Sequence, residues 1–397
     1  MSLNFTPAFS LKHPLSSISR FLFCFVLLGL FQRGTAQSLP HPDHIVILIE
    51  ENQPNFLVIG NSSAAPYINQ LGNDSNGVIF TKMYAIEHPS QPNYLDFFAG
   101  SNQGVYDDNL PTTYPFTTAN LARQLVDKGL SFVTYSQDLP SVGFDGVNSS
   151  TGSYVRKHNP VTNWVGNGQN QVSDSLNQPW SAFPTDFSKL PTVAFVVPNE
   201  DSDMHNGFGN PTISAGDFWF KEHMKPFIDW VATPGSNTLF IYTFDEDDGL
   251  EGNNIPTVFY GPMVKSGKVT TQYNLYNMLR TIEDIYGLGH AGAASTNVPI
   301  LDCWKTPTGI NSINGVNAIK CYPNPASSTL QFNGDALSQP NTEIEITDLT
   351  GKRINNITSN TGNSLSVDVS SYAGGMYFYN LMNEGRTVQT GKFIVTH

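Results

Sequence analysis

The chain has 397 residues, and its 39% hydrophobic and 12% aromatic content is enough for two or three globular domains with a substantial core. Only 13% of the residues are charged, and the formal net charge is −13 at pH 7. This balance argues against a nucleic-acid-binding protein, which normally needs a basic face. Anionic substrates stay open, because a bound cation can reverse the local field.

Residues 1–36 have the pattern of a signal peptide. Basic residues, including Lys12 and Arg20, precede an apolar segment at 21–31, and small residues lead to a predicted cleavage after Ala36. A membrane anchor is the alternative, but about 11 apolar residues are too few to span a bilayer, which needs roughly 20. We therefore expect export, with no transmembrane segment in the mature chain.

Apolar runs alternate with helical patterns between residues 38 and 308, which we predict to be one domain. Strands are expected at 44–49, 193–197 and 239–244, and helices at 118–128, 214–232 and 273–286. The alternation predicts an α/β fold with a mainly parallel sheet flanked by helices. Runs that are apolar throughout are typical of strands covered on both faces.

A polar cluster follows each of these strands. The clusters are Glu50-Glu51-Asn52, Asp203-Met204-His205 and Asp245-Glu246-Asp247-Asp248. Ligands bind beyond the carboxyl ends of the strands in open α/β sheets, so these side chains are expected to form a site there. Four adjacent acids after an apolar strand favour a bound cation. Taken alone, the first two acids could equally be solvated or cap a helix.

A candidate nucleophile lies at the predicted start of a helix. Pro92 suits the first turn of a helix, so Ser90 is expected at or near its N-cap, where free N–H groups attract an anion. A serine hydroxyl needs a base or a metal to become a nucleophile, and the acidic clusters could hold that metal. A plain capping serine is the alternative.

Two further segments could bind phosphate or transfer protons. Arg156, Lys157 and His158 are adjacent in a chain with little charge, and such groups can bind phosphate oxygens or protonate a leaving group. His205 is a second candidate proton donor. A solvated basic loop and an ordinary loop histidine are the alternatives.

The sequence pattern changes near residue 307. Residues 309–320 are predicted as a linker, and residues 321–397 carry short alternating strands separated by turns, which predicts a small all-β sandwich. Cys303 and Cys321 flank the linker. In an oxidising compartment they form either a disulfide or two free thiols.

The tail resembles the C-terminal sorting domain of proteins exported by the type IX secretion system. The matching residues are Tyr322-Pro323-Asn324-Pro325, Asp348-Leu349-Thr350-Gly351-Lys352, Gly374-Gly375-Met376-Tyr377-Phe378-Tyr379 and Lys392-Phe393-Ile394-Val395. The resemblance implies that the type IX machinery carries the chain across the outer membrane, to be released or attached to the cell surface. A carbohydrate-binding module is the alternative.

Residues 43–290 resemble the bacterial phosphoesterase family of acid phosphatases and phospholipases C, within the alkaline-phosphatase-like superfamily. The matching segments are Ile49-Glu50-Glu51-Asn52, His88-Pro89-Ser90-Gln91-Pro92-Asn93-Tyr94, Arg156-Lys157-His158-Asn159-Pro160, Asp203-Met204-His205 and Thr243-Phe244-Asp245-Glu246-Asp247-Asp248. The resemblance implies an alkaline-phosphatase-like fold and makes residues 38–308 the catalytic domain.

The same resemblance implies a site for a divalent cation. Its ligands would be Glu51, Asn52, Ser90, Asp245 and Glu246. Hard oxygen ligands suit Mg²⁺, Mn²⁺ or Ca²⁺. Ser90 matches the family's nucleophile, and the phosphate-binding and proton-handling residues match Lys157, His158 and His205. Glu50, Asp247 and Asp248 are then expected to support the ligands from behind or to be solvated.

We therefore expect a secreted, metal-dependent phosphomonoesterase of the acid-phosphatase type, acting through a phosphoseryl intermediate on a phosphorylated small molecule or a phospholipid head group. The phospholipase C branch has Thr followed by Asp-Pro-Asn-His, where this chain has Ser90-Gln91-Pro92-Asn93-Tyr94. A phospholipase C-type phosphodiesterase is therefore the second hypothesis. A non-catalytic surface adhesin or binding protein on the same scaffold is the third.

Overall fold

The computed structural model describes residues 39–207, 209–233, 235–250, 252–305, 319–359, 362–383 and 386–397. The predicted signal peptide and residues 309–318 of the predicted linker lie outside these ranges. No helix in the described part of the chain is long and apolar enough to cross a membrane.

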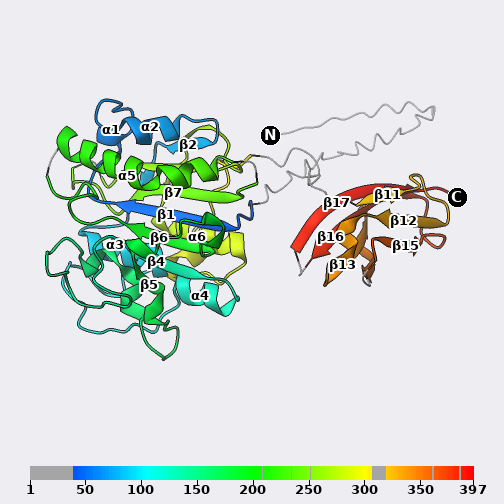
Figure 1. Cartoon of the computed structure of the whole chain (residues 1–397), viewed down its shortest axis with the longest axis horizontal. Coiled ribbons are helices and arrows are strands. Elements are labelled where there is room, and N and C mark those ends of the chain that lie inside the picture. Colours follow the sequence, from blue (N-terminus) through cyan, green and yellow to red (C-terminus); the bar gives the residue numbers. More distant parts are fainter. Residues whose placement is uncertain are drawn as a thin grey trace, which may run out of the picture. The chain divides into compact units, whose positions relative to one another are not determined.

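Residues 39–305 are organised around one eight-stranded sheet (Figure 1). Its order is β5-β4-β6-β1-β7-β8-β2-β9. The strands are β1 (His44–Glu50), β2 (Gly77–Phe80), β4 (Phe132–Ser136), β5 (Asn177–Pro179), β6 (Val193–Val197), β7 (Thr238–Phe244), β8 (Thr257–Tyr260) and β9 (Gly267–Val269). Only β8 runs antiparallel to its neighbours. The predicted α/β class with a mainly parallel sheet is confirmed.

The three strands predicted from sequence are the adjacent central strands β6, β1 and β7. Leu48 of β1 pairs with Val196 on one side and Tyr242 on the other, in parallel register. All residues of β6 and β7 are buried, as their apolar sequences require. Because the strands are adjacent and parallel, the polar residues after them emerge at one edge of the sheet.

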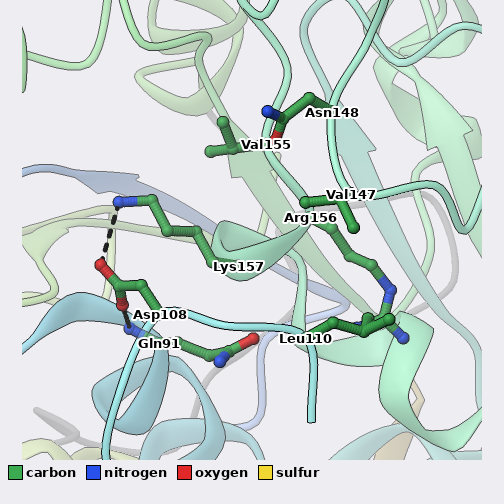
Figure 2. A pocket seen from close by; sticks show the side chains of 8 residues that line it. All are labelled: Gln91, Asp108, Leu110, Val147, Asn148, Val155, Arg156 and Lys157. Carbon is green, nitrogen blue, oxygen red and sulfur yellow. Dashed lines mark hydrogen bonds and ion pairs between the residues drawn. The ribbon is translucent and has the colours of Figure 1, made fainter.

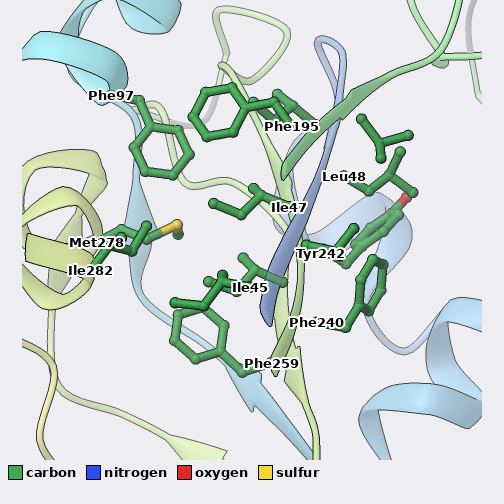
Figure 3. Packing of buried hydrophobic residues seen from close by; sticks show 14 of the residues in the cluster. Ile45, Ile47, Leu48, Phe97, Phe195, Phe240, Tyr242, Phe259, Met278 and Ile282 are labelled. Carbon is green, nitrogen blue, oxygen red and sulfur yellow. The ribbon is translucent and has the colours of Figure 1, made fainter. Parts of the chain in front are cut away.

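Helices cover both faces of the sheet. Figure 3 shows Ile45 and Ile47 facing Phe97 and Met278 on one side, whereas Leu48 faces the opposite side with Phe240 and Tyr242. The helices are α1 (Asn55–Val58), α2 (Pro66–Gly72), α3 (Ser90–Ala99), α4 (Leu121–Asp127), α5 (Asn210–Val231) and α6 (Leu275–Tyr286). A small parallel pair joins β3 (Met83–Tyr84) to β10 (Tyr273–Asn274). The 3₁₀ turns of this unit are η1 (Arg156–His158), η2 (Pro160–Trp164), η3 (Asp174–Leu176), η4 (Trp180–Ala182), η5 (Phe187–Lys189) and η6 (Gly292–Thr296).

The predicted helices occur with shifted ends. Helix α4 begins at Leu121 because the Asn120 side chain caps it, accepting a hydrogen bond from Arg123 N at 2.9 Å. Helix α6 begins at Leu275 because Asn274 and Asn277 cap each other's backbone N–H groups. The predicted starts of these two helices, at residues 118 and 273, lie before the capping residues and are therefore too early.

Residues 319–397 contain two antiparallel sheets. One has the order β11-β12-β15 and the other β14-β13-β16-β17. The strands are β11 (Lys320–Tyr322), β12 (Thr329–Asn333), β13 (Thr342–Asp348), β14 (Arg353–Thr358), β15 (Ser364–Asp368), β16 (Gly375–Asn383) and β17 (Arg386–Val395), with the 3₁₀ turn η7 (Asp335–Ser338). Inward residues such as Phe332, Ile344 and Phe393 form their own hydrophobic cluster. The predicted all-β tail is confirmed.

Cys303 and Cys321 are both unbonded in the structure. Cys303 is buried, and Cys321 is partly buried in β11. Burial raises the pKa of both thiols, that of Cys321 to about 12, so both are poor nucleophiles at neutral pH.

A buried carboxyl group in α3 makes stability depend on pH. Asp96 is 1% exposed; its Oδ1 accepts a hydrogen bond from the Tyr276 hydroxyl at 2.8 Å, and its Oδ2 has no partner among the described residues. Burial raises the pKa of Asp96 from 3.8 to about 7. The folded chain therefore retains a proton that the unfolded chain loses, so its stability falls as pH rises from about 4 to about 7.

We expect Asp96→Asn to remove this part of the pH dependence while keeping an acceptor for Tyr276. Relative to wild type, the variant should gain on the order of 2 kcal/mol of unfolding free energy between pH 4 and pH 8. Urea unfolding across that range measures the gain, with the exposed Glu222→Gln as the control. Parallel curves for wild type and Asp96→Asn would contradict the prediction.

Candidate active site

The three polar clusters meet where β6, β1 and β7 end. Glu51 N donates to the carbonyl of Asp203 at 2.7 Å, and Asp245 N donates to the carbonyl of Glu50 at 3.1 Å. Asn52 follows in the left-handed region, with φ at +48°, which asparagine tolerates better than most residues. The backbone itself therefore ties the clusters together.

Ser90 lies at the centre of these side chains. Its Oγ is 3.0 Å from Glu246 Oε1, 3.2 Å from Glu51 Oε2 and 3.4 Å from Asn52 Oδ1. Ser90 is the first residue of α3, and Pro89 occupies the N-cap. Ser90 is therefore near the N-cap, as expected, and its hydroxyl group contacts Glu246, Glu51 and Asn52.

The carboxylates around Ser90 fit a cation. Asp245 Oδ1 accepts hydrogen bonds from Glu246 N and Asn52 N, whereas its buried Oδ2 has no partner among the described residues. Burial, and then repulsion from Asp245, raises the pKa of Glu51 well above its usual value, and burial followed by repulsion from Glu246 does the same to the pKa of Asp245. Within the described ranges no lysine or arginine pairs with Glu51, Asp245 or Glu246. An unpaired buried oxygen in a set of hard oxygen donors suits a divalent cation.

His158 lies on the far side of Glu51. Its Nε2 is 3.1 Å from Glu51 Oε1 and its Nδ1 is 3.7 Å from Asp203 Oδ2, while its ring stacks on Tyr94 at a centroid distance of 5.2 Å. Burial lowers the pKa of His158 well below its usual value. Glu51, His158 and Asp203 also offer three ligand atoms within 4.8 Å of one another.

Lys157 extends from the same 3₁₀ turn toward the loop that contains Asp108. Its Nζ is 3.2 Å from Asp108 Oδ2, the ion pair drawn in Figure 2. The same Nζ is 3.9 Å from Glu200 Oε1. Burial alone would lower the pKa of Lys157, but the carboxylates of Glu51, Asp108 and Glu200 outweigh it and raise that pKa. Lys157 therefore stays protonated and can attract an anion. It also lines a cavity of about 290 Å³ with Gln91 and Asp108.

A larger cavity of about 520 Å³ opens over the carboxylates that surround Ser90. Asn52, His88, His205, Glu246 and Asp247 contribute to its wall. Ser90 is 1% exposed and does not line this cavity, but Asn52 and Glu246, which contact its hydroxyl group, do. The cavity therefore brings His205 to the same space as the partners of Ser90.

Of the two positions expected for Glu50 and Asp247, behind the ligands or in solvent, their burial agrees with the first. Glu50 is fully buried, and neither of its carboxylate oxygens has a partner among the described residues. Burial raises the pKa of Glu50 well above its usual value. Asp247 is 1% exposed and accepts hydrogen bonds from Gly249 N and Asn253 N, which fold the loop after β7. Among Glu50, Asp247 and Asp248, only Asp248 is exposed.

Several residues of the site were not assigned a role from the sequence. The Tyr94 hydroxyl donates to Glu51 Oε1, and His88 Nδ1 lies 2.6 Å from Glu246 Oε2. Tyr94 follows Ser90 by four positions, so helical spacing could have identified it. Asp108 and Glu200 come from loops without periodicity, and no local signal marks them.

Two family models match the chain. Residues 61–289 match the Phosphoesterase family, and residues 320–396 match the Secretion system C-terminal sorting domain. A phosphatidylinositol-3-phosphatase of Mycobacterium tuberculosis is 41% identical over 271 residues, which cover 68% of this chain and 85% of that protein. A probable acid phosphatase of Kluyveromyces lactis is 30% identical over 254 residues, covering 60% of this chain and 58% of that protein.

Solved structures with a similar backbone are more distant in sequence. A protein in the alkaline phosphatase superfamily from Vibrio parahaemolyticus is 13% identical, with a TM-score of 0.47. The match covers 75% of this chain and 76% of that chain.

Proposed function

Because the chain belongs to the Phosphoesterase family, we propose that it is a metal-dependent phosphomonoesterase of the acid-phosphatase type with Ser90 as its nucleophile. Its family and its phosphatase relatives make it a hydrolase of phosphoester bonds. Its C-terminal sorting domain makes it a secreted or cell-surface protein, exported by type IX secretion. The domain limits 38–308, 309–320 and 321–397 are part of the proposal.

One observation carries the assignment of the nucleophile. The Ser90 hydroxyl is the point at which Glu246, Glu51 and Asn52 converge within 3.4 Å. A capping serine would bond to its own helix, and an adhesin has no need to bury carboxylates around a hydroxyl group. The arrangement therefore supports an activated serine.

Five residues would hold the cation. They are Glu51, Asn52, Ser90, Asp245 and Glu246. When bound, the cation would lower the pKa of the Ser90 hydroxyl and neutralise charge on the phosphoryl group. Oxygen donors without a thiolate favour Mg²⁺, Mn²⁺ or Ca²⁺.

Each side chain of the site then has one role in the reaction. Ser90 Oγ forms the bond to phosphorus while its proton passes to Glu246 Oε1, 3.0 Å away. Lys157 binds the phosphoryl oxygens, with His158 beside it. The bond to the leaving oxygen breaks, and His205 donates a proton to that oxygen. Water then attacks the phosphoserine and gives its proton to His205, while the bond between phosphorus and Ser90 Oγ breaks, Ser90 takes back its proton from Glu246 and phosphate leaves. Positioning and electrostatics supply most of the catalysis in such transfers.

The substrate is proposed to be a phosphomonoester, on a small molecule or a phospholipid head group. The 41% identical phosphatidylinositol-3-phosphatase makes phosphatidylinositol 3-phosphate a specific candidate. A panel of p-nitrophenyl phosphate, phosphatidylinositol 3-phosphate and phosphatidylcholine tests this. We expect phosphate release from the two monoesters. Release of diacylglycerol from phosphatidylcholine without monoester hydrolysis would replace the proposal with a phospholipase C.

The tail is expected to be required for secretion and not for catalysis. Deleting residues 321–397 removes the strands of both antiparallel sheets, apart from the first residue of β11. We expect the truncated enzyme to be absent from the medium and the cell surface. Immunoblots of cells and medium measure this, and total expression is the control. Undiminished secretion would contradict the role of the tail.

A further inference from the structure

We propose that Glu200 is a positioning residue that connects the phosphate-binding lysine to the proton donor. This inference rests on the proposed function, because it takes Lys157 as a phosphate ligand and His205 as the acid. Glu200 lies in the loop after β6, outside the polar clusters and the family segments quoted from the sequence.

The carboxylate of Glu200 lies between two basic side chains. Its Oε1 is 3.9 Å from Lys157 Nζ, and its Oε2 is 3.2 Å from His205 Nδ1. The Glu200 side chain is 13% exposed, so little water competes for its two oxygens. One carboxylate can therefore set the positions of both groups.

The backbone around Glu200 is anchored independently of the site. Glu200 N donates to the carbonyl of Ser153 at 3.0 Å. Asn199 N donates to Gln137 Oε1 at 3.1 Å, and Asn199 Nδ2 donates to Asp138 Oδ2 at 2.6 Å. These bonds come from the loops that follow β4, so the carboxylate is held before a substrate binds.

The position of Glu200 selects which nitrogen of His205 faces the substrate. Nδ1 lies near two acceptors, Glu200 Oε2 at 3.2 Å and Asn206 Oδ1 at 3.3 Å, so it carries a proton. Nε2 has no hydrogen-bond partner in the part of the chain that the structure describes, and His205 lines the larger cavity. The Nε2 proton can therefore pass to the leaving oxygen as its bond to phosphorus breaks, which leaves a neutral ring with Nδ1 still protonated.

The same carboxylate limits the movement of Lys157. The Lys157 ammonium group also pairs with Asp108, whose side chain is 35% exposed. A phosphoryl group that binds Lys157 competes with Asp108, and Glu200 stays as the second anchor. Glu200 thereby keeps the ammonium group near the site during this exchange.

Glu200→Gln in the full-length protein tests the proposal with two monoesters. The p-nitrophenolate of p-nitrophenyl phosphate leaves with little need for a proton, whereas the alkoxide of glycerol phosphate needs one. We expect kcat for glycerol phosphate to fall roughly tenfold or more, and kcat for p-nitrophenyl phosphate to fall by less than about threefold. KM should rise for both substrates, because Lys157 loses an anchor. Glu222→Gln, the same change on the exposed face of α5, should alter neither.

A double-mutant cycle with His205→Ala separates positioning from a purely structural role. If Glu200 acts through His205, then Glu200→Gln should cause no further selective loss on glycerol phosphate once His205 is alanine. Equal slowing of both substrates by Glu200→Gln, or a selective loss that persists without His205, would overturn the proposal. Full p-nitrophenyl phosphate activity in Ser90→Ala would instead overturn the proposed function, whatever Glu200→Gln does.

Discussion

Replacing Ser90 with alanine is expected to lower kcat for p-nitrophenyl phosphate by roughly 10³-fold or more, because the attacking atom is removed. The fold should persist. The Ser90 hydroxyl group is hydrogen-bonded to two carboxylates and one amide oxygen, and a smaller side chain relieves crowding there. Initial rates with purified protein measure the loss, and circular dichroism checks that the variant is folded.

Ser90→Thr is the matched control, since it keeps a hydroxyl group at the same backbone position. Ser90 is 1% exposed, so the extra methyl group must be accommodated in a packed site. We expect partial activity, well above that of Ser90→Ala. Turnover by Ser90→Ala close to that of wild type would eliminate Ser90 as the nucleophile.

Asp245→Asn is expected to give a more stable apoprotein and a much less active enzyme. Burial and repulsion from Glu246 make the Asp245 carboxylate costly to the fold in the absence of a cation, and an amide removes the charge. The variant should gain about 1–2 kcal/mol of unfolding free energy without metal. Because it lacks a charged ligand, kcat/KM should fall by roughly 10²-fold or more.

Thermal unfolding with and without divalent cations measures both parts of this prediction. After chelation, adding Mg²⁺, Mn²⁺ or Ca²⁺ should raise the Tm of wild type and restore its activity, because a ligand that binds only the folded state stabilises it. The Tm of Asp245→Asn should respond much less. A chelated wild type that keeps full activity, or equal Tm shifts in both proteins, would contradict the cation site.

The central sheet was predictable because burial on both faces leaves a clear pattern. Runs such as Val193–Val197 are apolar throughout, and the strands begin and end within one residue of the predicted positions. Helix starts were less accurate. Asn120 and Asn274 set two of them by capping, which apolar spacing does not reveal, and α5 begins at Asn210, before the predicted residue 214. Strand β8 runs antiparallel in a mainly parallel sheet, and that direction depends on packing between distant segments.

The carboxylates around Ser90 were predictable for the same reason, since Glu51 and Asp245 directly follow buried strands and Glu246 comes next. The burial of Glu50 was not predictable, because it depends on neighbouring elements such as α5. Asp217 of α5 adds to the repulsion that raises the pKa of Glu50. Asp108 and Glu200 reach Lys157 from separate loops. Their roles depend on tertiary contacts that leave no trace in local sequence.

Trapping the phosphorylated enzyme tests the central claim most directly. Wild type mixed with excess p-nitrophenyl phosphate, quenched in acid and digested, should yield a peptide that carries one phosphoryl group on Ser90. The same experiment on Ser90→Ala should yield none. A phosphoryl group on another residue, such as His158 or His205, or rapid turnover with no phosphorylated peptide at any quench time, would contradict the serine mechanism.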